Sequence, residues 1–437
     1  MTIATVNDTD DLCRVGPGTV MGDMMRQYWI PAAMSSEVEA DGAPVRLMLL
    51  GEKLIAFRDS SGRVGIMDHR CPHRCASLFL GRNEEDGLRC IYHGWKFDVD
   101  GNCVDMPSVP VHQDFKDKVH AKAYRARERN GLIWVYMGER ADPPPLPLIE
   151  ANLLPVDEQR IVFIQRSCNW LQALEGDIDT SHFGFLHAGG VDPDDLRTED
   201  LMRYTVVDRA PEYHIADTDW GATYCAHRST SDGRTYWRFS NYMVPFWTQP
   251  PQGDIADHIS ARAWVPMDDT HTMTITISWT KMKPGIPALK TGKPIPGTKT
   301  AVPMMPNTTD WFGRWRPMAS EVNDWTLDRS LQKAGVYSGI EVVHLQDLAV
   351  TESMGACTDR DFEHLGPGDQ MIARTRRRLL QEARAFRDHR AVPARIDNPA
   401  IYYGPRAGEF LVPSNADWEA VYEEQLKSVL RPAVIHP

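Results

Sequence analysis

Two short motifs constrain this chain more than any other feature: C-x-H at Cys71–His73, and C-x-x-H at Cys90–His93, sixteen residues further on. Each motif supplies one thiolate and one imidazole, so a pair of loops would present two of each to a shared metal centre. This donor set is typical of a two-iron, two-sulfur cluster in which histidines replace cysteines on one iron. Neutral imidazole in place of thiolate raises the reduction potential of the cluster, so we expect a protein that handles single electrons.

A structural zinc site is the alternative interpretation of these residues. Zinc sites of Cys2His2 composition usually pair like ligands, as C-x2–4-C followed by H-x3–5-H. Each motif here mixes one cysteine with one histidine, and this mixed spacing favours the iron–sulfur cluster. Two further cysteines, Cys75 and Cys103, lie near the motifs but outside the ligand spacing, and we expect both to be small, buried, apolar side chains.

Length and charge exclude several classes of protein. The 437 residues are enough for two or three domains, and the net charge of −12 makes a nucleic acid a poor partner. The first residues are polar and acidic, unlike a secretory signal, and no window is long and apolar enough to span a bilayer. The eight cysteines are too dispersed for a disulfide scaffold, so we expect a cytoplasmic protein without membrane segments.

The apolar pattern predicts a small all-β domain followed by a larger α+β domain. Alternation from Pro44 to Arg58 indicates strands, and the proline-rich run Asp142–Pro147 is typical of a stiff linker. We therefore divide the chain into a lead-in at 1–40, which packs on the domains, a β domain at 41–145 and a catalytic domain at 146–437.

The larger domain is expected to contain an antiparallel sheet flanked by helices. Helices are predicted at Asn169–Asp179, Glu341–Ser353 and Gln370–Asp388, and an exposed loop at Lys283–Pro306. Strands are predicted at Met202–Val207, Glu212–Asp217, Thr223–Arg228, Tyr236–Val244, Ile259–Val265 and Thr272–Trp279. The last of these strands alternates apolar with polar residues, which suits a sheet with one buried face.

A second possible metal site begins in the first of these helices, where the chain has the skeleton E-x3-D-x2-H-x4-H ending in His182 and His187. Two histidines and one carboxylate on one face of a metal leave positions open for oxygen, as in non-haem iron(II) enzymes. On a straight helix the two histidines would point about 140° apart. They can share a metal only if the helix ends or deforms between them, for which Gly184 is a suitable place.

The carboxylate ligand must come from another segment, and Asp347 is the candidate. It lies among apolar residues of the predicted helix Glu341–Ser353, where an unpaired carboxylate would be costly to bury. Coordination to a cation would offset that cost. A capping or salt-bridged aspartate on a partly exposed face is the alternative interpretation, and the local sequence does not decide between them.

With both motifs in one chain, the sequence resembles the Rieske non-haem iron aromatic ring-hydroxylating oxygenases, in particular oxygenase components related to phthalate dioxygenase. The segments that carry the resemblance are Cys71–Arg74, Cys90–Trp95, Asn169–His187 and Gln346–Gly355. It implies a Rieske [2Fe-2S] domain and a helix-grip-like catalytic domain. Respiratory Rieske proteins carry an additional cysteine in each loop, joined as a disulfide, whereas Tyr92 occupies that place in the second loop here.

The resemblance also implies a role for each motif residue. Cys71 and Cys90 would bind one iron of the cluster, and His73 and His93 the other. His182, His187 and Asp347 would bind a mononuclear Fe(II). Asp179 would connect His182 by hydrogen bonds to a cluster histidine, His93, of a neighbouring subunit, because members of the family assemble as trimers or stacked trimers.

The implied reaction is the insertion of O2 into an aromatic carboxylate such as a phthalate, isophthalate or substituted benzoate, giving a cis-dihydrodiol. Electrons would come from NAD(P)H through a separate flavin and iron–sulfur reductase, since the chain has no dinucleotide-binding or plant-type ferredoxin motif. A monooxygenase or O-demethylase with the same metals is the first alternative, and a pure electron carrier the second. An arginine of a strand after the histidine motif would bind the substrate carboxylate. We expect Arg238, in an aromatic-rich strand, before the other candidates, which are Arg203, Arg209, Arg228 and Arg262.

Overall fold

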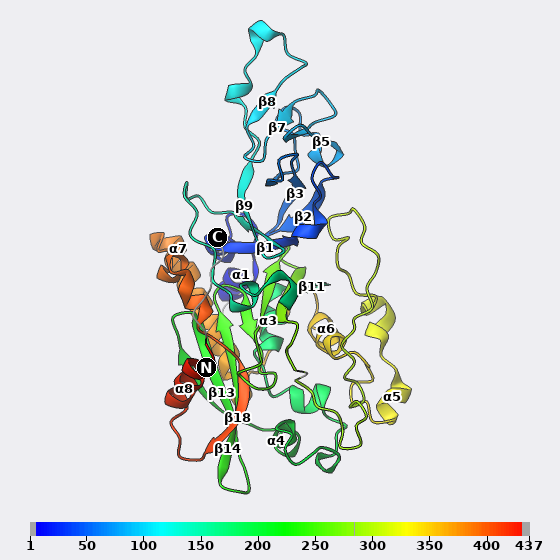
Figure 1. Ribbon diagram of the computed structural model, residues 1–437, viewed down its shortest axis with the longest axis vertical. Helices are drawn as coiled ribbons and strands as arrows, with labels where there is room; N and C mark the ends of the chain where they lie inside the picture. The colour runs from blue at the N-terminus through cyan, green and yellow to red at the C-terminus, as the bar shows by residue number, and fades with distance from the viewer. Residues whose placement is uncertain (1–5, 284, 431–437) are drawn as a thin grey trace.

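The computed structural model describes residues 6–283 and 285–430. The molecule is elongated, with a narrow β-rich part at one end and a broader part of sheet and helices at the other (Figure 1). The narrow part is formed by residues 29–136, and the broad part by the remainder of the chain, including the helices that precede residue 29. This arrangement confirms the predicted α+β fold class.

The narrow part contains two antiparallel sheets. The six-stranded sheet has the order β1-β10-β9-β4-β3-β2, and the four-stranded sheet the order β5-β6-β7-β8. The strands of the first sheet are β1 (Trp29–Met34), β2 (Val45–Leu49), β3 (Glu52–Arg58), β4 (Val64–Asp68), β9 (Ala123–Arg129) and β10 (Leu132–Tyr136). Those of the second are β5 (Arg82–Glu84), β6 (Gly87–Arg89), β7 (Lys96–Phe97) and β8 (Cys103–Asp105). Strand β1 belongs to the lead-in, so residues 1–40 contribute a strand to the sheet of the β domain; the boundaries at 40 and 145 stay a prediction.

The broad part is built on an eight-stranded antiparallel sheet with the order β11-β17-β16-β15-β14-β13-β12. Its strands are β11 (Gln159–Arg166), β12 (Glu212–Asp217), β13 (Gly221–Ser229), β14 (Arg234–Met243), β15 (Trp247–Gln249), β16 (Ser260–Pro266), β17 (Thr272–Trp279) and β18 (Gly408–Pro413). One edge of β14 is shared, because β18 pairs with its first half and β15 with its second half. The sheet therefore includes a strand from near the end of the chain.

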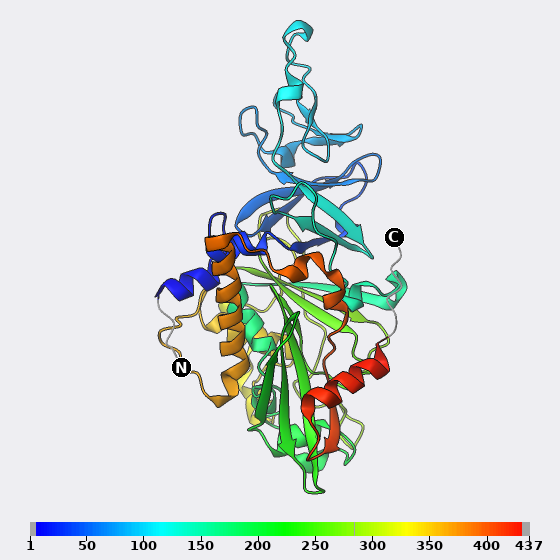
Figure 2. The ribbon, with the colours of Figure 1, turned by 90° about the vertical axis from the view of Figure 1, so that its left-hand side faces the viewer.

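Helices lie on this sheet and in the segments around it. They are α1 (Val6–Cys13), α2 (Val20–Met25), α3 (Trp170–Asp177), α4 (Met202–Val207), α5 (Arg329–Lys333), α6 (Val343–Ser353), α7 (Gln370–His389) and α8 (Trp418–Val429). The longest, α7, runs beside the sheet against β12 and β13, as Figure 2 shows. Helix α3 packs on β15 and β16 and also contacts α6. No helix of the described residues is long and apolar enough to cross a membrane.

A continuous hydrophobic core joins the two parts. Trp134 of β10 stacks on Trp247 of β15 with ring centroids 5.8 Å apart, and both side chains are fully buried. Backbone hydrogen bonds add to this contact: the N–H groups of Leu50 and Gly51 donate to the carbonyls at the end of β16, at 3.0 and 2.8 Å. The β domain is therefore packed on the larger sheet rather than tethered by a free linker.

One predicted strand was wrong, and several helices and strands were missed. Residues Met202–Val207 form helix α4, in which Met202, Thr205 and Val206 are buried. Their spacing of three and four residues is helical, although the β-branched residues favoured a strand. Helices α1, α5 and α8 and strands β11 and β18 were not predicted. The segment Lys283–Pro306 contains no helix or strand in its described residues, as predicted.

Candidate metal centres

A π-helical turn places the two histidines of the second motif together. Helix α3 ends at Asp177, before both histidines, and residues Phe183–His187 form a single π turn in which Ala188 N–H donates to Phe183 O at 3.1 Å. A π turn aligns residues five apart, and such turns occur often at functional sites. The expectation of a helix that deforms at Gly184 was therefore only partly right: the helix has ended earlier, and a separate turn brings His182 and His187 onto one side.

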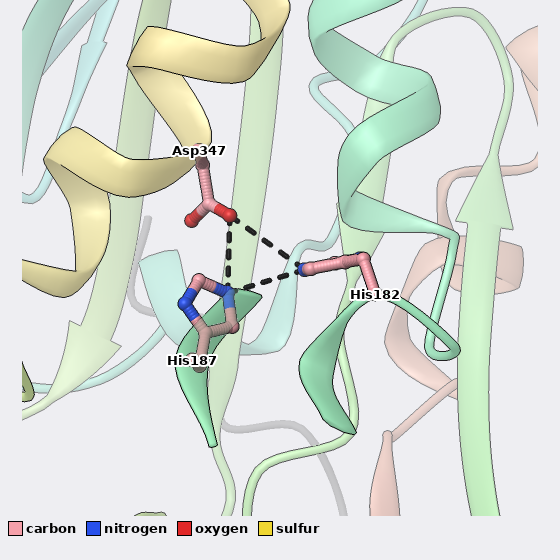
Figure 3. Close-up of side chains that lie close together, drawn as sticks. All are labelled: His182, His187 and Asp347. Atoms are coloured by element: carbon pink, nitrogen blue, oxygen red, sulfur yellow. Dashed lines mark hydrogen bonds and ion pairs between the residues drawn. The ribbon is translucent and has the colours of Figure 1, made fainter. Parts of the chain in front are cut away.

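His182, His187 and Asp347 converge on one point (Figure 3). Nε2 of His182 lies 3.2 Å from Nε2 of His187, and Asp347 Oδ1 lies 3.1 Å from the latter and 3.6 Å from the former. Two imidazole nitrogens and one carboxylate oxygen this close together suit the coordination of a divalent cation between them. The side chains come from the π turn and from α6, so the tertiary fold assembles the group.

Outer hydrogen bonds orient both imidazole rings. Gln346 donates from Nε2 to the carbonyls of Gly297 and Ile340, at 2.8 and 2.7 Å, which turns its Oε1 toward His187 Nδ1 at 2.7 Å. The Nδ1–H of His187 then donates to that oxygen and leaves Nε2 free for a metal. His182 Nδ1 lies 3.3 Å from Asp179 Oδ2, and the other oxygen of Asp179 accepts from Ser181.

Neighbouring groups perturb the protonation of the site. Burial works against the charged form of Asp347, but His187 and His182 outweigh it and hold the pKa of this carboxyl well below its usual range. Burial also lowers the pKa of His344, one turn earlier on α6, to about 4, and the charge of Arg262 acts in the same direction. His344 is therefore a neutral imidazole at pH 7.

The triad opens on a cavity of about 740 Å³. Its wall is largely apolar and includes Phe183, Leu186, Trp264, Ile295 and Val343. This volume suits a small aromatic molecule. The polar residues of the wall include three arginines: Arg166, Arg238 and Arg262.

The predicted substrate arginines differ in position. Arg238 lines the cavity, and its guanidinium lies over the ring of Phe183 at 4.9 Å. Arg209 and Arg228 are not part of the cavity wall: Arg209 donates to Gly189 O, and Arg228 donates to Asp208 O. Arg166, at the end of β11, was not predicted, because the candidate arginines were those of strands after the histidine motif. The position of Arg166 just before the histidine motif was the signal in the sequence that could have identified it.

The two cysteine–histidine loops share one backbone pattern. In the first loop Cys75 N–H donates to Cys71 O at 2.8 Å, and in the second Gly94 N–H donates to Cys90 O at 2.9 Å. The N–H of each leading cysteine is bonded in turn to the carbonyl five residues later, at 2.8 Å in both loops. The loops between β4 and β5 and between β6 and β7 therefore have matching backbone turns.

The side chains of these loops fit the donor set of the cluster. Cys71 and Cys90 are buried and in contact, and the rings of His73 and His93 lie 4.4 Å apart. Trp95 stacks on His73 at 4.3 Å. Nδ1 of His93 is buried without a hydrogen-bond partner among the described residues, as expected of an atom reserved for a metal.

The expectation for the two additional cysteines was right for one of them. Cys103 is buried, but Cys75 is exposed, with a φ of 59°. It occupies the position that Gly94 holds in the second loop, and the left-handed backbone there directs its side chain to solvent.

Loops that pair cysteine with histidine, together with a His-His-Asp triad beneath an apolar cavity, define an oxygenase of the Rieske non-haem iron type. Residues 28–116 match the family model of the Rieske [2Fe-2S] domain, and residues 135–433 match that described as LigXa C-terminal domain like. The chain is 50% identical over 98% of its length to all of the 3-chlorobenzoate-3,4-dioxygenase oxygenase subunit of Comamonas testosteroni. It is 36% identical over 88% of its length, and 89% of the relative, to the phthalate 4,5-dioxygenase oxygenase subunit of Pseudomonas putida.

Solved structures agree with this fold. Dicamba monooxygenase bound to dicamba superposes with a TM-score of 0.54, covering 82% of this chain and 98% of that one, at 17% identity. Pseudomonas putida CBB5 NdmA, as a mutant with theobromine, gives 0.55 over 91% and 99%, also at 17% identity. The chain therefore belongs to the Rieske aromatic ring-hydroxylating oxygenases, as an oxygenase component.

Proposed function

We propose that this protein inserts O2 into an aromatic carboxylate, giving a cis-dihydrodiol, with electrons supplied from NAD(P)H by a separate reductase. The observation that carries the proposal is the His182, His187 and Asp347 triad at the wall of an apolar cavity that contains buried guanidinium groups. An aromatic ring suits the apolar wall, and a carboxylate suits an arginine.

We assign the metal ligands from the geometry. His182, His187 and Asp347 would hold a mononuclear iron, Cys71 and Cys90 one iron of the cluster, and His73 and His93 the other. When bound, the mononuclear iron supplies the open coordination positions at which oxygen chemistry takes place. The protein orients the ligand rings through Gln346 and Asp179, and its apolar wall keeps water from the substrate.

The nature of the substrate is supported by relatives whose names specify aromatic acids. One is a 3-chlorobenzoate-3,4-dioxygenase subunit and another a phthalate 4,5-dioxygenase subunit. Arg238 is the cavity arginine that the sequence predicts for the carboxylate, and it is 5% exposed. A bidentate guanidinium in a dry pocket recognises a carboxylate strongly.

We further propose that the active assembly is a homotrimer or a stack of trimers. The cluster loops lie beside β5 and β7 in the outer half of the narrow part, whereas α6 lies in the broad part, far along the long axis (Figure 1). A cluster supplied by a neighbouring subunit would shorten the electron path. Asp179, whose carboxylate already holds His182, would connect that iron ligand to the neighbour's cluster histidine.

A monooxygenase or O-demethylase reaction is the second candidate. The 5,5'-dehydrodivanillate O-demethylase oxygenase subunit of Sphingobium sp. is 31% identical over 91% of this chain. Both reactions use the same metal sites, so only the product distinguishes them. A pure electron carrier would use the cluster alone.

Turnover of phthalate isomers and substituted benzoates by the reconstituted protein, with a surrogate reductase and product identification by mass spectrometry, tests the proposal. We expect a dihydrodiol that is two oxygen atoms and two hydrogen atoms heavier than an aromatic acid. A product with one added oxygen would favour the second candidate. About three iron and two sulfide per chain are expected for an oxygenase, and a count of two and two would contradict both oxygenase reactions.

A further inference from the structure

The three arginines that line the cavity differ in whether a carboxylate already neutralises them. Arg262 forms a close ion pair with Asp177, and its side chain is 10% exposed. Arg238 has Glu409 at 3.5 Å. Among residues 6–283 and 285–430, no carboxylate lies within ion-pair distance of Arg166.

Hydrogen bonds to the protein also engage the guanidinium of Arg238. Its Nη1 donates to Thr180 Oγ1 and its Nη2 to Pro251 O, both at 2.7 Å. Its Nε is buried without a hydrogen bond but lies 3.5 Å from Oε2 of Glu409, which is opposite it on β18, so each of the three guanidinium nitrogens faces a group of the protein. A ligand carboxylate at Arg238 would therefore compete with partners that the protein already provides.

Arg166 has spare donors. It is 6% exposed, its Nη1 donates to Thr351 Oγ1 at 2.8 Å, and its Nε is buried without a partner. Its guanidinium carbon lies 4.9 Å from the ring centroid of Trp264. The charge of Arg166 reaches Asp347, but no carboxylate of the described residues pairs with this guanidinium directly. Burying a guanidinium without an ion pair is costly, and a carboxylate from a ligand offsets that cost.

The position of Arg166 relates it to the iron ligands. Thr351, which accepts its hydrogen bond, lies one turn after Asp347 on α6 and donates its own hydroxyl to the carbonyl of Asp347 at 2.8 Å. Arg166 and Trp264 both belong to the cavity wall. An anionic group held there would fix an aromatic ring beside the triad, with Trp264 as part of the surrounding apolar surface.

We infer that Arg166 binds the carboxylate of the aromatic substrate and selects aromatic acids over neutral aromatics of the same shape. This inference rests on the proposed function and deepens it. It gives Arg238 a different role, which is to hold Thr180 and the Pro251 segment in place at the cavity wall.

The test compares a carboxylate with its neutral counterpart. Binding of 3-chlorobenzoate and 3-chlorobenzamide to the metal-loaded protein is measured by calorimetry for the wild type, Arg166→Gln, Arg166→Lys and Arg238→Gln. Arg160→Gln is the matched control, because Arg160 is an exposed arginine of the same strand. We expect Arg166→Gln to weaken chlorobenzoate binding by about 30-fold or more, the loss typical of a hydrogen-bonded charged partner, and chlorobenzamide binding by less than about threefold.

The outcomes distinguish a failure of the Arg166 inference from a failure of the proposed substrate class. If Arg166→Gln keeps the wild-type ratio of affinities while Arg238→Gln loses it, Arg238 is the anchor and our inference is wrong. Equal weakening of both ligands by Arg166→Gln would make its role purely structural. If the wild type itself does not prefer the acid, the proposed substrate class fails instead. If Arg166→Gln loses iron or cluster absorbance, Arg166→Lys replaces it in the comparison. This variant keeps the positive charge but not the two parallel donors of the guanidinium, and the same ratio of chlorobenzoate to chlorobenzamide affinity is measured.

Discussion

Gln346 and His187 form a hydrogen bond of 2.7 Å, and Gln346 directly precedes Asp347 in α6. One helix thus provides the carboxylate of the triad and, from the adjacent residue, the group that orients a histidine of the triad. Because Gln346 is itself fixed by two backbone carbonyls, its oxygen cannot turn away without leaving its amide unpaired.

Removing this amide should weaken metal binding without removing a ligand. We expect Gln346→Leu to reduce iron affinity by about 10- to 100-fold, the usual effect of losing an outer partner of a ligating histidine. Iron retained against a chelator is the measurement, and cluster absorbance is the internal reference. Gln346→Glu, which keeps the acceptor, should retain more iron than the leucine variant; equal losses would show that orientation of His187 is not the reason.

Asp179 should affect electron delivery more than metal content. Its carboxylate accepts from Ser181 and lies 3.3 Å from Nδ1 of His182. In Asp179→Asn we expect both metal sites to stay filled, while oxidation of the pre-reduced cluster in a single turnover slows by at least about tenfold. Stopped-flow absorbance follows the cluster directly. An unchanged rate would exclude Asp179 from the electron path.

A buried acidic group should make stability depend on pH. Glu175 of α3 binds Arg360 at 3.1 Å and Arg376 at 2.6 Å, and although burial alone would raise its pKa, the two guanidinium groups hold the pKa below its ordinary value of 4.5. A lowered folded-state pKa means that the stabilisation is complete above about pH 4.5 and is lost as the pH falls toward the folded-state value.

Glu175→Gln should therefore flatten the dependence of the unfolding free energy on pH below about 4.5. At pH 7 the variant should lose about 3 kcal/mol, because it leaves two buried arginines with Glu363 as the one described carboxylate that still pairs with both. Denaturant unfolding at several pH values provides both measurements. A parallel pH profile for variant and wild type would show that Glu175 is not the group responsible.

The stacked pair Trp134 and Trp247 should couple the unfolding of the two parts of the molecule. Both rings are fully buried in one core that extends across the sheets. We expect the wild type to show one calorimetric transition. Trp134→Ala should cost about 3 to 5 kcal/mol and split that transition, because a cavity would open between the parts. Two transitions already present in the wild type would contradict this coupling.

The sequence was most informative where chemistry requires fixed residue types at fixed spacing. The paired motifs at Cys71–His73 and Cys90–His93 are sufficient on their own to indicate a Rieske domain, and the alternating pattern of Thr272–Trp279 indicates strand β17. These signals are local: each depends on residues within one turn, loop or strand. For Asp347 the apolar surroundings visible in its own helix were a weaker signal, because they did not distinguish a metal ligand from a capping or salt-bridged aspartate.

Features that depend on distant contacts were not predictable. The π turn at Phe183–His187 has no local signature, and helix α4 consists of residues that favour strands but bury a helical face. The partners of the cavity arginines were also invisible, because Arg238 meets Glu409 across about 170 residues of chain, and Arg166 meets Thr351 from another element. Only the assembled sheet shows which guanidinium remains available.

Strand β18, near the end of the chain, pairs with an edge of β14, whose Arg238 lines the cavity. Because β18 aligns Glu409 directly opposite Arg238, the C-terminal strand sets the electrostatic balance of one side of the cavity. A shortened protein ending before Gly408 would keep every proposed metal ligand, yet it would leave Arg238 without its counter-charge. Removing this strand is thus a change to the wall of the cavity itself.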